Sequence, residues 1–413
     1  MINFVAKSFS LMNLHYFNPG HEAAVFNGSP FYCAPANVQL LQNELSFLPS
    51  WYAQSNDFVL VGSNFDFTFY EKLKNNFPSF PQPIFVDKNC VIDFKNKENP
   101  NVPMSAAYWG VSPAAIHFFE KIREENAINL SVGRWKEEFT GLCSRRAAQK
   151  CLMYLKQQIP QITVDIPVFV NSMQNIENEI NKTNEMLLVK EPFSSSGRGI
   201  LRIDAQNFTR SVRQIVQGWL NRQGYVSIEK MYDKILDFAM EFRCTAGENT
   251  DFLGYSLFET DTKLSYTGNI LDSQKNIEDK ICKFIHIELI EKIRNEIGYF
   301  LNEKYKNYSG LLGIDMLIYI SENQYFIYPC VEINIRANMG IVAINFVEKY
   351  LCADKTGRFN VNFCRKEGEV FVNHCLLTKN CPARFWQGKL CEGYLPLCPV
   401  NENNKFWAYV IVG

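Results

Sequence analysis

The sequence predicts an α/β protein that begins with a doubly wound α/β domain and continues into an α+β part with longer strands. In residues 1–130, short apolar strand-like runs alternate with helix-like segments, the pattern of a parallel sheet covered by helices. Beyond about residue 160, strand-like runs follow one another in pairs, which indicates antiparallel hairpins. A chain of 413 residues is long enough for two or three domains.

The individual elements support this division. Residues 112–126 are the clearest helix, because Ser112 is a good N-cap and apolar residues recur at helical spacing. Residues 18–30 are expected to form a loop after the first strand. The other expected elements are strands at 11–17, 57–62, 83–87, 186–192, 225–231, 238–246, 252–260, 310–320 and 324–337, and helices at 38–48, 144–158, 208–220 and 277–305. Domain boundaries are expected near 130 and 345, and residues 346–413 form a strand-rich extension.

The composition argues against a nucleic-acid-binding or membrane protein. The formal net charge is −1, and no run reaches the ~18 apolar residues that a membrane helix needs. The N-terminus lacks the long apolar core of a signal peptide. The 13 cysteines form no CxxC pair and follow no regular spacing, so reduced thiols in the cytoplasm are expected.

Polar side chains stand inside the two apolar runs at 310–337. Glu332, Asn334 and Arg336 alternate along the second run, so they share one face of a strand. If the two runs pair, Asp315 of the first run joins them. Two carboxylates and an amide oxygen are hard ligands that Mg²⁺ prefers beside phosphate oxygens and water. A buried ion pair between Glu332 and Arg336 is the simpler alternative.

The stretch VKEPFSSSGRGI at 189–200 ends a strand-like run in a lysine and continues into a small polar loop. Lys190 can reach a phosphate as a point charge. The loop offers backbone N–H groups, hydroxyls and glycines that let a polyphosphate approach closely. The loop is neither a Walker A sequence nor a GxGxxG fingerprint, and many such loops are ordinary turns.

A third segment, YVSIEKMY at 225–232, runs from an apolar strand into Glu229, Lys230 and Met231. Such a segment can give adenine two backbone hydrogen bonds while a carboxylate binds ribose hydroxyls. A strand that ends in a charged turn is the alternative interpretation.

Taken in order, VKEPFSSSGRGI, IEKMY, GIDMLIY and VEINIRANMG resemble the ATP-grasp superfamily, whose signature ends in E-x-N-x-R. The resemblance covers roughly residues 140–345. It implies a two-lobed ATP-grasp domain at 131–345, with a lid at about 145–226. A pre-ATP-grasp α/β domain at 1–130 would precede it, and the strand-rich C-terminal extension at 346–413 would follow.

The resemblance also implies roles for individual residues. Lys190 and Arg336 would be catalytic, with Lys190 on the α- or β-phosphate and Arg336 on the transferred phosphoryl group or the acyl-phosphate. Asp315, Glu332 and Asn334 would hold one or two Mg²⁺ ions, and Mn²⁺ would suit the same ligands. The residues expected to bind ATP are Lys190, Ser194, Ser195, Ser196, Gly197, Arg198, Gly199, Glu229, Lys230, Met231, Glu241 and Arg146.

One position departs from the family. Many members carry a lysine at the start of the helix before the first motif strand, where this chain has SRRAAQK. Arg145 or Arg146 would take its place, and the sequence does not choose between them. Arginine binds phosphate in a bidentate manner, so the exchange is reasonable but not equivalent.

The loop FNPGHEAAVFNGSP would face the acceptor substrate, because ligands bind beyond the C-terminal ends of parallel strands. Asn18, His21 and Glu22 are the candidates there, and Arg243 is a further candidate for phosphate or substrate. Residues 108–113 would line the same cleft or simply pack. An ordinary NPG turn, with Glu22 favouring a helix N-terminus, is the alternative interpretation of the loop.

The resemblance thus implies a cytoplasmic ATP-dependent carboxylate–amine ligase. It would form an amide or peptide-like bond through an acyl-phosphate and release ADP and phosphate. Its partners would be a small carboxylate and an amine, without nucleic acid or membrane. An ATP-grasp small-molecule kinase and a nucleotide-binding module without turnover are the alternatives. The C-terminal extension fits either a homodimer contact or a substrate cap.

Overall fold

The computed structural model describes residues 12–62, 65–87, 89–93, 102–194, 197 and 199–413. Its N-terminal sheet is parallel apart from one antiparallel edge strand, β4. The order across this sheet is β4 (Ile92–Asp93), β3 (Gln82–Val86), β2 (Phe58–Gly62), β1 (Met12–Tyr16), β5 (Met104–Tyr108) and β6 (Leu130–Ser131). The accompanying helices are α1 (His21–Asn27), α2 (Ala36–Glu44), η1 (Leu48–Trp51), α3 (Phe67–Asn76) and α4 (Pro113–Asn126). The predicted α/β class is confirmed.

Two local predictions are wrong and one is confirmed. The expected loop at 18–30 contains the short helix α1. The expected helix at 277–305 is two helices, α9 (Gln274–Cys282) and α10 (Ile287–Lys304), which turn Ile281 and Ile290 into the same core. An uninterrupted apolar period hides such a turn because both helices cover one sheet face. Ser112 does cap α4, since its hydroxyl accepts a hydrogen bond of 3.2 Å from the Ala115 amide.

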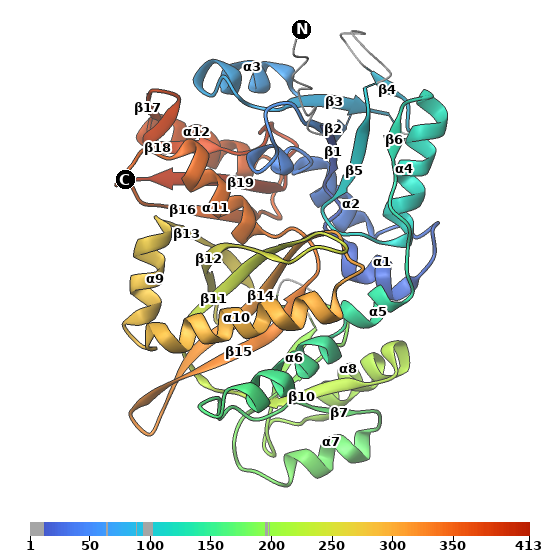
Figure 1. The fold of residues 1–413 in the computed structure, drawn as a ribbon, viewed down its shortest axis with the longest axis vertical. Coiled ribbons are helices and arrows are strands. Elements are labelled where there is room, and N and C mark those ends of the chain that lie inside the picture. Colours follow the sequence, from blue (N-terminus) through green and yellow to red (C-terminus); the bar gives the residue numbers. More distant parts are fainter. Residues whose placement is uncertain (1–11, 63–64, 88, 94–101, 195–196, 198) are drawn as a thin grey trace, which may run out of the picture.

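A small antiparallel sheet lies at one end of the molecule (Figure 1). Its order is β7 (Val168–Val170), β10 (Val226–Lys230), β8 (Leu187–Lys190) and β9 (Ile200–Ile203), with helices α7 (Met173–Ile180) and α8 (Arg210–Gln223). The helices α5 (Glu138–Leu142) and α6 (Arg145–Gln158) connect the N-terminal sheet to it. This sheet has its own apolar cluster, which includes Ile176, Val189 and Trp219. It can therefore act as a separate lobe beside the rest of the fold.

A large antiparallel sheet extends from the middle of the molecule toward the end opposite the small sheet (Figure 1). Its order is β15 (Gln324–Asn334), β14 (Gly310–Ser321), β11 (Asp233–Cys244), β12 (Asp251–Thr260), β13 (Tyr266–Leu271), β16 (Gly357–Phe363), β19 (Phe406–Val412), β18 (Lys389–Pro396) and β17 (Arg384–Trp386). Two further helices, α11 (Met339–Tyr350) and α12 (Glu369–Asn380), lie between strands of this sheet in the sequence. The C-terminal extension thus continues the central sheet through the pairing of β13 with β16. No helix of the described residues is long and apolar enough to cross a membrane.

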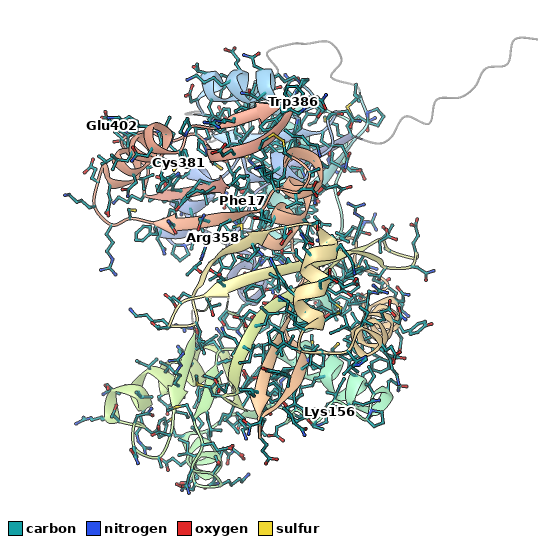
Figure 2. All side chains as sticks on the ribbon, turned by 90° about the vertical axis from the view of Figure 1, so that its left-hand side faces the viewer. Phe17, Lys156, Arg358, Cys381, Trp386 and Glu402 are labelled. Carbon is teal, nitrogen blue, oxygen red and sulfur yellow. A yellow bond between two sulfur atoms is a disulfide. The ribbon has the colours of Figure 1, made fainter. Side chains whose placement is uncertain are left out.

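The N-terminal and C-terminal parts of the chain share one apolar core. Figure 2 shows the blue N-terminal and orange C-terminal elements together, at the end opposite the green elements of the small sheet. Trp51 is fully buried in this core, and its indole N–H donates to the Leu397 carbonyl at 2.8 Å. Its ring also contacts Phe346 and Tyr350 of α11. The predicted boundaries near 130 and 345 stay predictions, but the two flanking parts pack as one unit.

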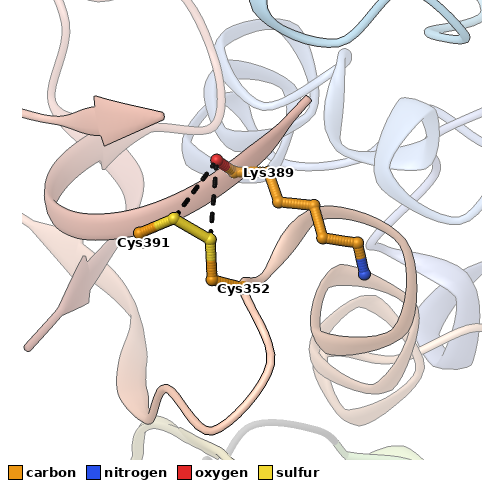
Figure 3. The surroundings of a disulfide bond; sticks show 3 residues. All are labelled: Cys352, Lys389 and Cys391. Carbon is orange, nitrogen blue, oxygen red and sulfur yellow. Dashed lines mark hydrogen bonds between the residues drawn. A yellow bond between two sulfur atoms is a disulfide. The ribbon is translucent and has the colours of Figure 1, made fainter. Parts of the chain in front are cut away.

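The described cysteines include one disulfide, between Cys352 and Cys391 (Figure 3). The expectation of reduced thiols throughout is wrong for this pair. The two cysteines are 39 residues apart in the sequence. An isolated β-bridge between the preceding residues, Leu351 and Leu390, brings the Cα atoms of Cys352 and Cys391 to 4.8 Å. Because this proximity arises from tertiary structure, cysteine spacing in the sequence could not reveal it.

The shared core predicts a sharp contrast between two tryptophans. Trp51→Ala should lower the free energy of unfolding by about 3–5 kcal/mol, because it leaves a large cavity in the core. Trp386→Ala is the matched control, since Trp386 is 68% exposed and should change it by less than about 0.5 kcal/mol. Denaturant unfolding of both variants measures the difference. Equal effects would show that the two flanking parts do not share a core.

Candidate active site

The predicted pairing of the two strands that carry the acidic motif is confirmed. Asp315 on β14 lies directly opposite Glu332 on β15, and Gly313 lies opposite Asn334. The Asn334 amide donates to the Asp315 carboxylate at 3.0 Å. Asp315, Glu332 and Asn334 all line one cavity of about 410 Å³. The period-two argument concerned Glu332, Asn334 and Arg336, which all line this cavity, and the strand pairing adds Asp315 to them.

A third carboxylate enters this cavity from the neighbouring strand. Glu241 on β11 is only 1% exposed and accepts hydrogen bonds from Ser256 at 2.8 Å and Asn338 at 2.7 Å. Gly313 and Gly340 lie so close to this carboxylate that a Cβ atom at either position would collide with it. Glycine at both positions lets the strand and helix α11 approach the buried acid.

Burial dominates the electrostatics of these acids. It raises the pKa of Glu241 to about 7, although the hydrogen bonds from Asn338 and Ser256 act in the opposite direction. Burial also raises the pKa of Asp315 well above its usual value, and the charges of Glu332 and Glu241 add to the shift. A cation in the cavity would relieve both effects.

The donor set fits a hard divalent cation. It does not supply all the ligands itself, because the described residues contain no group of three or more His, Cys, Asp or Glu side chains arranged to hold a metal ion. Asp315, Glu332 and Asn334 supply two carboxylates and an amide oxygen, so phosphate oxygens and water would complete the shell, as Mg²⁺ prefers. Their assignment as metal ligands stays a prediction.

Two arginines from distant parts of the chain reach the acidic hairpin. The Nε of Arg336 donates to the Glu22 carboxylate of α1 at 2.5 Å, and a second nitrogen of Arg336 donates to Asn334 at 3.3 Å. Arg145, at the start of α6, lies 3.3 Å from the Glu332 carboxylate. The simpler alternative was an ion pair between Glu332 and Arg336. In the structure Glu332 instead pairs with Arg145, and Arg336 pairs with Glu22. Burial raises the pKa of Glu22, but the charges of Arg336 and His21 and the hydrogen bonds that Glu22 accepts together outweigh it, so the net pKa is lowered.

The structure distinguishes Arg145 from Arg146. Arg145 is 7% exposed, and it donates to the Glu191 carbonyl at 2.9 Å and to the Ser194 hydroxyl at 3.2 Å. The exposed Arg146 instead stacks its guanidinium on the rings of Phe169 and Tyr225. Arg145 is therefore the better candidate for the place of the family's helix lysine.

Lys190 lies where β8 ends and is 4% exposed. Its ammonium group pairs with the Glu229 carboxylate, which also accepts a hydrogen bond of 3.1 Å from the Tyr328 hydroxyl. Burial lowers the pKa of Lys190 to about 7, and the nearby Arg145 charge acts in the same direction. The two residues predicted for phosphate and adenine thus meet in the small sheet, on the lobe opposite the acidic hairpin.

Of the serine- and glycine-rich loop, Gly197 lines the cavity. Ser195, Ser196 and Arg198 fall outside the described residues. Gly197 has φ +73° and lies directly on the backbone of Leu264, so a side chain would not fit there. Gly199 has φ +71°, and Ser194 is tied to Arg145. Both glycines occupy conformations that other residues rarely adopt.

In the segment at 225–232, two residues predicted to bind ATP already have partners within the protein. Lys230 pairs with Glu185 at 2.6 Å near the surface. The Met231 amide, predicted to contact adenine, donates to the Met186 carbonyl at 3.0 Å. Adenine could accept a hydrogen bond from the Met231 amide only if the hydrogen bond to Met186 opened. The contact between Met231 and adenine therefore stays a prediction.

The residues predicted to touch the acceptor are divided between two places. Asn18 exchanges hydrogen bonds of 2.6 and 3.1 Å with the Gly110 backbone, and His21, 1% exposed, contacts the Val111 carbonyl at 2.9 Å. These side chains hold the loop against the segment after β5. Arg243 lines a different cavity of about 740 Å³. Their predicted contact with a substrate stays untested.

Sequence reasoning missed most of the apolar wall of the acidic cavity. Trp109, in the segment 108–113, both lines the cavity and packs in the core. Leu41, Phe363 and Phe406 were not singled out, although each lines the cavity. Their only signal is an apolar side chain on an exposed element, which by itself is common.

Comparison with known proteins supports the fold. No family model and no curated protein sequence matches the chain. Biotin carboxylase from Campylobacter jejuni, solved as a β,γ-ATP complex, is 10% identical over 98% of this chain and 88% of that chain, with a TM-score of 0.50. N5-carboxyaminoimidazole synthetase from Staphylococcus aureus in complex with ADP is 13% identical over 97% and 93%, with a TM-score of 0.46. At such identities the likeness concerns the fold alone, and the mixed α/β architecture predicted from the sequence is shared with this biotin carboxylase.

The raised pKa of Glu241 predicts how stability changes with pH. Between about pH 4.5 and 7 the folded protein holds a proton that the unfolded chain has lost, so its stability falls as the pH rises. Glu241→Gln should remove up to about 3 kcal/mol of this loss between pH 5 and 8, measured by denaturant unfolding without metal. Glu402→Gln, at the exposed position labelled in Figure 2, is the control. Parallel pH profiles of wild type and Glu241→Gln would contradict the assignment.

Proposed function

We propose that the protein is an ATP-dependent carboxylate–amine ligase that works through an acyl-phosphate and releases ADP and phosphate. The observation that carries the proposal is the convergence of Glu241, Asp315 and Glu332 on one cavity, beside Arg145 and Arg336. Metal-bound phosphate transfer needs such a cluster, because it supplies oxygen ligands and cations at one place. The ATP-grasp fold, seen also in a biotin carboxylase solved with an ATP compound, supports the proposal.

In the proposed reaction, a carboxylate oxygen of the substrate forms a bond to the γ-phosphorus of ATP. The bond from that phosphorus to the bridging oxygen breaks, and ADP leaves. The amine nitrogen then bonds to the carbonyl carbon, phosphate departs and the amine loses a proton. Catalysis consists mainly of positioning and electrostatic stabilisation, so no protein nucleophile is required.

The residues of the chain divide this work. Asp315, Glu332 and Asn334 would hold Mg²⁺, which when bound would offset the charge of the phosphates. Arg336, oriented by Glu22, would stabilise the phosphoryl group that is transferred. Lys190 would contact the phosphates closer to the adenosine. The loop at 193–199 would exclude water from the reactive acyl-phosphate.

The two adjacent arginines provide a matched pair for testing the nucleotide site. Arg145→Ala should weaken MgATP binding roughly 10- to 150-fold, because a charged hydrogen bond contributes about 1.5–3 kcal/mol. Arg146→Ala should change the affinity less than about threefold, since Arg146 stacks on rings at the surface. Calorimetry with MgATP measures both. Equal losses in the two variants would contradict the placement of the phosphates beside Arg145.

Trapping with hydroxylamine tests the reaction class. A ligase that forms an acyl-phosphate should yield a hydroxamate when hydroxylamine replaces the amine, together with ADP. A small-molecule kinase would release ADP and leave a stable phosphorylated product without hydroxamate. A screen of small carboxylates that gives neither ADP nor hydroxamate, despite MgATP binding, would favour the nucleotide-binding module without turnover.

A further inference from the structure

The cavity that holds the acidic hairpin has two chemically different ends. Its charged lining residues among those described are Glu241, Asp315, Glu332 and Arg336, and all belong to the end formed by β11, β14 and β15. The other end is lined by apolar and uncharged polar side chains, namely Asn37, Val38, Leu41, Trp109, Tyr266, Asn269, Val361, Asn362, Phe363 and Phe406. A ligand that spans the cavity therefore meets charge at one end only.

The apolar end is built from segments that are distant in the sequence. Phe363 on β16 lies directly opposite Phe406 on β19, with their ring centroids 4.8 Å apart. Val361 shares the face of Phe363, because side chains alternate along a strand. Phe359, two residues earlier on this face, is fully buried in the core. The same strand face thus passes from core to cavity wall at Val361.

Polar contacts hold these segments together. Glu44 at the end of α2 accepts hydrogen bonds from the backbone N–H groups of Lys405 and Phe406, at 3.1 and 2.7 Å. Val38, earlier on α2, lies directly against Gly20. The wall is therefore fixed on both sides and forms part of the folded structure.

Trp109 connects the apolar end to the reactive end. Trp109 is only 2% exposed, and it lines the cavity. Its carbonyl accepts a hydrogen bond of 2.6 Å from the Ala337 amide, one residue after Arg336. A group held against Trp109 would therefore lie next to the residue expected to stabilise the transferred phosphoryl group.

The apolar character is specific to this cavity. The larger cavity, of about 740 Å³, is lined by Arg134, Lys136 and Arg243, and by the buried pair of His15 and Asp57. At the apolar end of the acidic cavity, a second carboxylate or a phosphate would lose water without gaining a cation. An aromatic or branched apolar group would instead bury its surface there.

We propose that the acceptor-side substrate is a small carboxylate with an uncharged aromatic or apolar group, which binds between α2, Trp109 and the β16–β19 edge. This inference rests on the proposed function for the placement of the reacting carboxylate. It gives the C-terminal extension a role in the substrate site, because Val361, Phe363 and Phe406 all belong to it.

Two carboxylates of different character test the proposal by calorimetry with MgADP present. 3-Phenylpropionate carries a phenyl group where succinate carries a second carboxylate. The wild-type protein should bind 3-phenylpropionate at least about tenfold more tightly than succinate. Phe363→Ala should weaken the binding of 3-phenylpropionate roughly 5- to 30-fold. It should change the affinity for MgADP less than about twofold. Phe363 is 51% exposed, so its truncation leaves the core intact.

Two control variants locate the binding. Trp386→Ala removes another exposed aromatic side chain and should leave both affinities unchanged. Arg134→Gln alters the larger cavity and should also leave 3-phenylpropionate binding unchanged. Loss of binding in Arg134→Gln but not in Phe363→Ala would overturn the proposal, as would a preference for succinate or no binding of 3-phenylpropionate.

The outcomes separate this inference from the proposed function. If wild type fails to bind MgADP, the proposed function is contradicted, whereas Phe363-dependent binding of 3-phenylpropionate would still support the apolar subsite. If MgADP binds but Phe363→Ala has no effect on 3-phenylpropionate, the inference alone is overturned.

Discussion

The convergence of Glu241, Asp315 and Glu332 on one cavity, where Asp315 meets the charges of the other two carboxylates, is the constraint on which the rest of the site depends. Buried carboxylates are costly unless cations or hydrogen bonds compensate them. The chain supplies partial compensation from two directions, with Arg145 from the start of α6 and Arg336 from the end of β15. A bound divalent cation would complete it. The site therefore combines the features that a metal–nucleotide complex requires, at the expense of stability in its absence.

Arg336 is also the point where the three parts of the chain meet. Glu22 of the N-terminal part holds its guanidinium, and an isolated bridge joins its backbone to Gly110 after β5. The C-terminal strands reach the same cavity through Val361, Phe363 and Phe406, while continuing the central sheet. The fold thus brings a reactive end, supplied by the central hairpin, next to an apolar end supplied by both flanking parts. The same two flanking parts share one apolar core.

The sequence revealed most of what depends on local pattern. Alternation within 332–336 placed Glu332 and Asn334 on one face, and the pairing with Asp315 followed from the hairpin. The sequence could not reveal features that depend on contacts between distant segments. Nothing local distinguishes Arg145 from Arg146, because the choice depends on which one turns toward Glu332. The pairing of Cys352 with Cys391 and the cavity wall at Phe363 and Phe406 likewise arise only when separate strands come together.

The most direct test of the account is the metal dependence of nucleotide affinity. ADP binding would be measured by calorimetry with Mg²⁺ and with a chelator, for wild type and for Asp315→Asn. If the acidic cluster holds the metal, Mg²⁺ should tighten ADP binding to wild type by at least about tenfold, which corresponds to about 1.4 kcal/mol, and Asp315→Asn should lose most of this gain. Equal ADP affinity with and without Mg²⁺ in wild type, or an undiminished gain in Asp315→Asn, would contradict the central claim.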